Sequence, residues 1–174
     1  MMKKTVSPAK ITWKWTSFKD LSTLELYAIL KLRQEVFVVE QQCAYLDCDD
    51  LDKEAYHLTG ILVNLSDHRV TNSKLPQHEI VAYMRIICPG VKTEHPSFGR
   101  LLTHKTIRKK GIGRQLLREA IINTNRIYPD SQIQISAQLY LESFYKDFGF
   151  VTVSKAYDED GIPHIDMIRS GQKN

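Results

Sequence analysis

A basic segment that contains two glycines, Lys105 to Ala120, is well suited to bind an anion. It reads KTIRKKGIGRQLLREA and has no acidic residue between Lys105 and Arg118. A turn that opens a helix leaves backbone N–H groups unpaired, and the helix dipole adds about half a positive charge there. Gly111 and Gly113 carry no Cβ, so a phosphate could approach the backbone closely. We therefore predict a phosphate site at this turn.

The spacing of these glycines excludes two common phosphate-binding motifs. A P-loop needs Gly-Lys-Ser/Thr after four intervening residues, which the segment lacks, and a dinucleotide fingerprint needs a third glycine where Leu116 stands. The pattern that remains is Arg108-x-x-Gly111-x-Gly113. Without an anion, the same residues would form an ordinary turn beside a solvated basic face.

An acidic segment, LDCDDLDKE from Leu46 to Glu54, is the counterpart of the basic one. A calcium loop of the EF-hand type would need glycine at its sixth position and glutamate at its twelfth, where this chain has Asp52 and Leu58. We therefore expect no bound metal. The carboxylates from Asp47 to Asp52 are expected to solvate the loop or to attract a cationic amine.

The chain as a whole has the composition of one globular domain. Its 174 residues are 43% hydrophobic and 25% charged, and the net charge is +4, too small to support nucleic-acid binding by itself. The N-terminus lacks the apolar run of a signal peptide, and no segment approaches a membrane span, so we expect a single cytoplasmic domain over residues 1–174. Three cysteines without CxxC spacing are expected to be reduced and mostly buried: Cys43, Cys48 and Cys88.

Hydrophobic periodicity predicts the elements that must position these residues. Ser22 and Glu25 form a capping box that starts a helix, and the stretch before YPD has apolar residues at helical spacing. The order of strands and helices implies a central mixed sheet with helices on both faces. Strands are predicted at 11–15, 57–64, 79–88, 98–103, 132–137, 150–157 and 162–169, and helices from 22 to about 37–39, from 111 to the YPD stretch, and at 141–148.

These motifs resemble those of the GNAT superfamily of N-acetyltransferases. Arg108-x-x-Gly111-x-Gly113 looks like the pyrophosphate motif of that family, and FYKDFGF, with Tyr145, looks like its tyrosine segment. The block LRQEVFVVEQQCAYLDCDDLDKEAYHL and the closing DEDGIPHIDM are similar to the ElaA-like branch. Together the matches run from about Leu21 to Met167.

The resemblance implies an α+β fold with a GNAT-like, mostly antiparallel central sheet. It also implies an acetyl-CoA-dependent enzyme that moves an acetyl group directly to a primary amine. Gln138 stands where many members have asparagine, so the amide is retained but its reach differs. The residues expected to bind the coenzyme are Leu101, Leu102, Thr103, Arg108, Lys109, Lys110, Gly111, Ile112, Gly113, Arg114 and Gln138.

The resemblance also suggests catalytic residues. Tyr145 would protonate the departing thiolate, because a phenol with an ordinary pKa of about 10 is protonated at neutral pH. Glu40 is the first candidate for the base that deprotonates the amine, with Gln41 placed to bind substrate. His57 and His164 are secondary candidates. The alternative interpretations are a core aromatic for Tyr145 and a surface carboxylate or a salt bridge at a helix end for Glu40.

Two other functions stay open at this point. One is an enzyme like acyl-homoserine-lactone synthases, which share the fold and an R..VF element. The other is a non-catalytic module that binds CoA or nucleic acid through the basic segment. Because no aromatic stacking motif lies among the basic residues, we expect no nucleic acid as partner. The resemblance implies a small-molecule or peptide amine instead. The acceptor and the oligomeric state are not fixed by the sequence.

Overall fold

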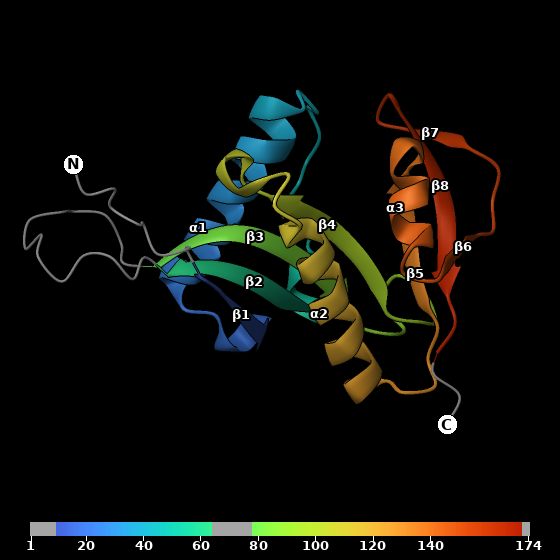
Figure 1. Ribbon diagram of the computed structural model, residues 1–174, viewed down its shortest axis with the longest axis horizontal. Coiled ribbons are helices and arrows are strands. Elements are labelled where there is room, and N and C mark those ends of the chain that lie inside the picture. The colour runs from blue at the N-terminus through green and yellow to red at the C-terminus, as the bar shows by residue number, and fades with distance from the viewer. Residues whose placement is uncertain (1–9, 64–77, 172–174) are drawn as a thin grey trace, which may run out of the picture.

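Within the part of the chain that the structure describes, one eight-stranded sheet forms the centre of the fold (Figure 1). The structure is a computed structural model that describes residues 10–63 and 78–171. The strand order is β1-β2-β3-β4-β5-β8-β6, and β7 pairs with β8. Among these pairs β4 and β5 are parallel and the others antiparallel, so the predicted mixed, mostly antiparallel sheet is confirmed. The strands are β1 Lys10–Ser17, β2 Ala55–Val63, β3 His78–Ile87, β4 Ser97–Thr103, β5 Ile133–Gln138, β6 Phe150–Thr152, β7 Tyr157–Glu159 and β8 Ile162–Arg169.

In residues 10–63 and 78–171, three α-helices accompany the sheet: α1 Thr23–Arg33, α2 Ile112–Ile127 and α3 Glu142–Lys146. Both hydrogen bonds of the predicted capping box form at the start of α1. The chain then continues as a wider π-helical segment over Gln34–Glu40. No helix in the described part of the chain is both long and apolar enough to cross a membrane. Short 3-10 turns lie at Phe18–Asp20, Leu51–Glu54, Lys105–Ile107 and Leu139–Leu141.

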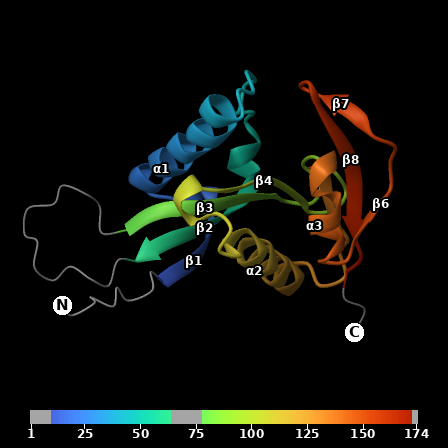
Figure 2. The ribbon, with the colours of Figure 1, turned by 45° about the horizontal axis from the view of Figure 1, so that its top comes forward.

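The helices α1 and α2 cover opposite faces of the sheet (Figure 2). On one face, Ile29 and Leu32 of α1 pack in a buried cluster with Tyr83. On the other face, Leu116 and Leu117 of α2 belong to the larger core cluster. Successive side chains of a strand point to opposite faces of its sheet, so β3 contributes side chains to both clusters. The predicted arrangement with helices on both faces is therefore confirmed.

The segment 150–157 was predicted as one strand, but it forms two. Both β6 and β7 pair with β8, and the chain leaves the ladder between them. Ser154 causes part of this break, because its hydroxyl accepts the backbone N–H of Asp166 at 2.8 Å. A side chain thus takes the place of a backbone carbonyl in the ladder.

The three cysteines are less buried than predicted. All are free thiols, but Cys48 is exposed and Cys43 and Cys88 are half-buried, so the expectation of mostly buried thiols was wrong. Cys43 and Cys48 lie on the irregular loop after the first helix, where little packs against them. The polar connection predicted between β2 and β3 lies largely outside the described residues, at 64–77.

Candidate active site

The parallel strands β4 and β5 separate soon after they pair. They are in register only at Ser97 with Gln134 and at Phe98 with Ile135. Beyond these residues β4 stays with β3, whereas β5 stays with β8, and the sheet opens between them (Figure 1). A cleft of about 390 Å³, lined from both strands, lies at this opening.

A β-bulge shapes the β4 wall of the cleft. Tyr83 pairs with Leu102 and Arg85 with Gly99, so two residues of β4, Arg100 and Leu101, lie opposite the single Met84 of β3. Arg100 has a φ of 55°, in the left-handed region. A bulge leaves backbone groups of the extra residue unpaired. Leu101 lines the cleft, so the bulge forms part of its wall.

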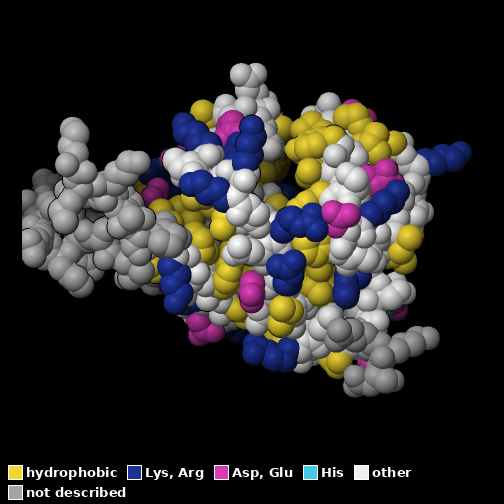
Figure 3. Space-filling view, in the orientation of Figure 1, with side chains coloured by type: hydrophobic (Ala, Val, Ile, Leu, Met, Phe, Trp, Pro, Cys, Tyr) yellow, Lys and Arg dark blue, Asp and Glu magenta, His cyan; other side chains and the backbone are white. Residues whose placement is uncertain are grey.

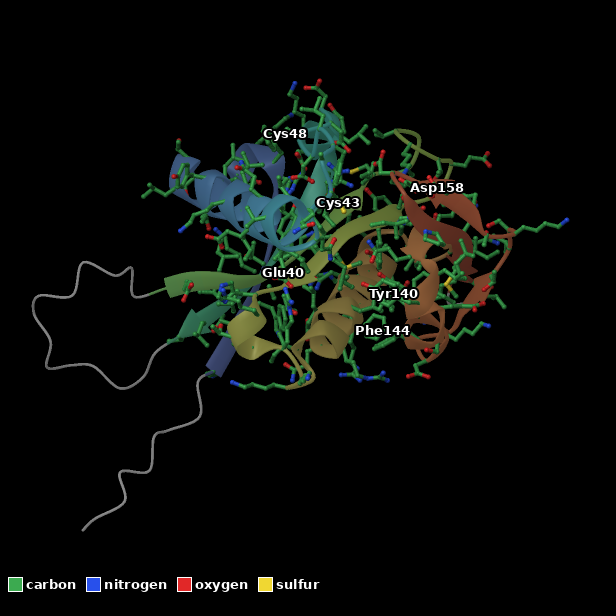
Figure 4. The ribbon with its side chains drawn as sticks, turned by 90° about the horizontal axis from the view of Figure 1, so that it is seen from above. Glu40, Cys43, Cys48, Tyr140, Phe144 and Asp158 are labelled. Carbon is green, nitrogen blue, oxygen red and sulfur yellow. The ribbon has the colours of Figure 1, made fainter. Side chains whose placement is uncertain are left out.

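Several of the predicted site residues meet at this cleft. Leu101, Gln138 and Tyr145 line it, as do Gln41 and His164. Figure 4 looks down on the site, with Glu40 and Cys43 on the side of α1, and Tyr140, Phe144 and Asp158 on the side of α3 and β7. The two walls therefore come from opposite halves of the chain.

Tyr145 is both a core residue and a cleft residue. Its ring packs edge-on against Phe144 at 5.1 Å and against Phe150 at 5.7 Å between centroids, and the residue is only 7% exposed. Burial raises the pKa of the Tyr145 phenol well above its usual range. The phenol therefore keeps its proton at neutral pH and can donate a hydrogen bond into the cleft.

The start of α2 has the geometry predicted for an anion site. Gly111 adopts a φ of 76°, and the first helical bond runs from Gln115 N–H to the Gly111 carbonyl at 3.1 Å. The amides of Ile112 and Gly113 therefore precede the first hydrogen-bond donor of the helix and have no acceptor within it. A Cβ added at Gly113 would meet no atom within 4 Å, so the space in front of these amides is open.

Most of the basic side chains near this turn already have partners. Arg108 Nε donates to the Thr103 carbonyl at 3.0 Å, and its two other nitrogens donate to the Glu40 carboxylate. Arg114 donates to Asp147 at 2.8 Å and lies 4.9 Å over the Phe148 ring. These contacts hold positive charge in place around the helix start, and Lys and Arg side chains spread over the face that carries α2 (Figure 3).

Glu40 forms an ion pair and does not lie where a catalytic base was expected. Its carboxylate is bound by Arg108, with 2.9 Å between Arg108 Nη2 and Glu40 Oε2, and it is not among the described residues that line the cleft. The hydrogen bond from Arg108 lowers the pKa of Glu40. A lowered pKa makes a carboxylate a weaker base, which favours the salt-bridge interpretation.

Most carboxylates of the acidic loop are bound by arginine side chains and not by solvent, contrary to expectation. Asp47 and Asp52 are buried, and Arg33, itself fully buried in α1, donates to both carboxylates at 2.7 Å. Arg85 and Arg100 bind the same loop from β3 and β4, with Asp49 taking two hydrogen bonds from Arg85 at 2.6 and 2.7 Å. Three aspartates and three arginines thus form one largely buried ion-pair network, in which each of these carboxylates is bound by arginine.

The same network contains His57. The ring is fully buried, with Nδ1 2.8 Å from the Tyr83 hydroxyl and Nε2 3.0 Å from the Asp52 carbonyl. Burial lowers its pKa. His57 does not line the cleft, so the structure does not bring it to the site. Within the described residues no group of three or more His, Cys, Asp and Glu is arranged to hold a metal ion.

The β7–β8 hairpin supplies cleft residues that the sequence did not single out. Glu159 and Asp160 line the cleft beside Ser136 of β5. The sequence showed only a closing hairpin around DEDG. The pairing of Ser136 with Asp166 across β5 and β8 brings these groups together, and such pairing cannot be read from spacing along the chain.

Comparisons with known proteins agree with this geometry. The family model described as an acetyltransferase (GNAT) domain matches residues 72–170. A UPF0039 protein of Synechocystis is 44% identical over 91% of this chain and 95% of its own length, and ElaA of Escherichia coli is 36% identical over 91% and 96%.

Solved structures of acyltransferase relatives also superpose on this chain. An acyl-CoA N-acyltransferase from Pseudomonas aeruginosa superposes with a TM-score of 0.80 at 34% identity, covering 92% of this chain and all of that one. The Escherichia coli ElaA structure gives 0.79 at 34%, with the same coverage. A CoA-dependent acyl-homoserine lactone synthase gives 0.70 at only 12%, over 94% of this chain and 85% of that one, and therefore shares the fold alone.

The strands β4 and β5 separate, and the first amides of α2 are unpaired within the helix. Together with these matches, this arrangement defines an acyltransferase of the GNAT type. The chain belongs to the GNAT acetyltransferase family. Within that family its relatives and its fold place it in the ElaA-like branch.

Proposed function

We propose that this protein is an acetyl-CoA-dependent N-acetyltransferase that moves the acetyl group directly to a primary amine of a small molecule or peptide. The observation that carries the proposal is the cleft between β4 and β5. It has bulged backbone on one wall and the protonated phenol of Tyr145 on the other. During the transfer, the thioester carbonyl oxygen and the sulfur each gain negative charge, and each needs a hydrogen-bond donor. A backbone amide on one wall and Tyr145 on the other would be these donors.

The coenzyme would run from the start of α2 into the cleft. The open amides of Ile112 and Gly113 suit a pyrophosphate. Arg108 and Arg114 would bind it by turning from the carboxylates that they now contact, Glu40 and Asp147. Lys109 and Lys110 would add positive charge. Backbone groups of Leu101 to Thr103 would bind the pantetheine arm, and an amide of the bulge would polarise the thioester carbonyl. Gln138, which lines the facing wall, would contact the same arm.

The transfer needs no covalent enzyme intermediate. The neutral amine attacks the thioester carbon, the carbonyl oxygen takes the charge, and the C–S bond breaks as the amide forms. Tyr145 would donate to the departing sulfur. Because burial raises the pKa of Tyr145, full transfer of its proton to a thiolate with an ordinary pKa of about 8.5 is uphill. We therefore assign it a hydrogen bond that strengthens as the sulfur gains charge, with the proton supplied in the end by the attacking nitrogen.

The base that deprotonates the acceptor is not fixed by this scheme. Glu40 stays the sequence-based prediction, but its ion pair with Arg108 and its lowered pKa weaken the case. His164 lines the cleft, with Nδ1 2.8 Å from the Ile162 carbonyl, and remains available through its other nitrogen.

A screen of primary amines tests the proposal. Acetyl-CoA is supplied with alkylamines, amino acids and short peptides, and the released thiol is measured. Transfer is expected to at least one class, with an acetylated product of matching mass. Release of thiol without any acetylated amine, across the whole panel, would contradict it. A lactone product from S-adenosylmethionine would favour the synthase-like alternative.

A further inference from the structure

Four oxygen-bearing side chains on the β5–β7–β8 wall form a continuous chain of contacts. Glu159 Oε2 lies 2.8 Å from Ser136 Oγ, Ser136 Oγ lies 2.6 Å from the Tyr157 hydroxyl, and that hydroxyl lies 2.8 Å from Asp166 Oδ1. Glu159 and Ser136 line the cleft, whereas Tyr157 and Asp166 are not among its described lining residues. The chain therefore leads from the cleft to a carboxylate outside its wall.

When both carboxylates are charged, this row of four side chains has one hydrogen too few to make a hydrogen bond at every contact. It has three oxygen–oxygen contacts but only two hydroxyl hydrogens, from Ser136 and Tyr157. If Ser136 donates to Glu159 and Tyr157 donates to Asp166, the 2.6 Å contact between the two hydroxyls holds no hydrogen. Burial raises the pKa of Tyr157, as does Asp166, while the Ser136 hydrogen bond opposes them, so the phenol keeps its hydrogen. One added proton completes all three hydrogen bonds.

We propose that Glu159, Ser136, Tyr157 and Asp166 form a relay that takes the proton from the acceptor ammonium at Glu159 and passes it to Asp166. The inference rests on the proposed function, because it names the route by which that reaction loses its proton. The relay also favours a primary alkylamine, protonated at neutral pH, as the acceptor class.

The proton count of this step balances. The ammonium gives one proton to the Glu159 carboxylate and becomes the neutral amine. Once the Ser136 hydroxyl has turned to donate to Tyr157, Glu159 passes its proton to Ser136, Ser136 passes its own to Tyr157, and Tyr157 passes its own to Asp166. Release of that proton from Asp166 to solvent, with rotation of the Tyr157 hydroxyl back towards Asp166, restores the starting state. The transfer as a whole yields amide, thiol and one proton.

The surroundings hold the relay in position and set its field. Tyr157 stacks on His164 with 6.3 Å between ring centroids, and the Asp166 backbone N–H is bound by Ser154. The charged groups and the imidazole around it are His164 on β8, Asp158 and Asp160 on the hairpin, and Asp49, Lys92 and Arg100 on the facing wall. The cleft is also lined by the titratable side chains of Cys43, Tyr45, Tyr140 and Tyr145. Asp158 is itself occupied, because its Oδ1 accepts the Gly161 N–H at 3.1 Å.

A titration followed by ¹³C NMR of side-chain carboxyls tests the relay without any substrate. In the wild type, the signals of Glu159 and Asp166 should shift over one shared pH range, because one proton serves both. In Ser136→Ala they should shift independently, and Ser136→Thr, which keeps the hydroxyl, should restore the shared range. Independent shifts already present in the wild type would overturn the proposal.

Kinetics with the alkylamine that reacts fastest in the screen give the second test. Ser136→Ala and Asp166→Asn should lower kcat/KM about tenfold at pH 7 and approach the wild type above the pKa of the amine, where the acceptor is already neutral. Asp130→Asn, on an exposed turn, is the matched control. An equal loss at every pH, or no loss, would overturn the relay and leave the transferase function standing. A wild type that transfers nothing would instead contradict the function.

Discussion

Asp47 and Arg100 form an ion pair that joins the loop after the first helix to the bulge of β4. Arg100 Nε donates to Asp47 Oδ1 at 2.6 Å, and Arg33 Nε donates to the other oxygen at 2.7 Å. A left-handed backbone costs a non-glycine residue about 1–2 kcal/mol, and Arg100 adopts one. The ion pair offsets that cost, so the loop helps to hold the cleft wall in its bulged form.

Removal of the Asp47 carboxylate should destabilise the protein strongly. Asp47→Ala leaves the fully buried Arg33 with part of its charge unpaired, and breaking such a pair costs about 3–5 kcal/mol. Urea denaturation measures the free energy of unfolding. Asp50→Ala is the control, since the Asp50 side chain is 86% exposed and an exposed pair contributes less than about 1 kcal/mol. A loss below about 1 kcal/mol for Asp47→Ala would contradict the account of this network.

Stability should fall in acid through Asp49. Burial opposes its ionisation, but hydrogen bonds from Arg85 outweigh this and lower its pKa to about 2. A carboxyl with a lowered pKa stabilises the fold fully above its unfolded pKa of about 3.9, and this stabilisation is lost as the pH falls to about 2. Asp49→Asn should therefore be less stable at pH 7 and should lose less stability than the wild type between pH 4 and pH 2. Equal slopes over that window, measured by urea denaturation, would show that Asp49 does not contribute.

The sequence predicts local features of this fold better than long-range ones. The capping box at Ser22 and the glycine turn at Gly111 depend on neighbouring residues, and both form as predicted. The ion pairs of Asp47 with Arg33 and Arg100 join residues 14 and 53 positions apart, so the acidic loop was misread as solvated. Likewise, the relay depends on the register of β8 against β5, which places Asp166 opposite Ser136.

Gly113→Ala should separate coenzyme binding from stability. Gly113 has an ordinary helical backbone, and a Cβ there would meet no protein atom within 4 Å, so the free energy of unfolding should change by less than about 1 kcal/mol. The added methyl would instead occupy the space in front of the first amides of α2. We expect at least a tenfold weaker affinity for acetyl-CoA, measured by calorimetry. Unchanged affinity would place the pyrophosphate elsewhere.

Tyr145→Phe should lower kcat more than it changes KM for acetyl-CoA. Only the hydroxyl is lost, while the aromatic packing on Phe144 and Phe150 is kept. Loss of one hydrogen-bond donor to charge that develops in the transition state typically lowers turnover by about 10²–10³-fold. The control is Tyr27→Phe, at a residue that is 70% exposed on the first helix. Unchanged turnover in Tyr145→Phe would leave Tyr145 a core aromatic with no part in the chemistry.

Glu40→Gln tests Glu40 against Glu159 as the base. Since Glu40 binds Arg108, the variant should raise KM for acetyl-CoA several-fold and leave the pH profile of kcat/KM unchanged. Glu159→Gln should instead change the pH profile. If Glu40→Gln removes the dependence on an ionised base, Glu40 is the base and the relay is wrong.

Calorimetric titration of the protein with acetyl-CoA tests the central claim most directly. The cleft between β4 and β5 and the open start of α2 predict a single saturable site, with a dissociation constant in the micromolar range and about tenfold or greater weakening in Gly113→Ala. The absence of any binding heat at millimolar acetyl-CoA, with a folded protein, would contradict the account.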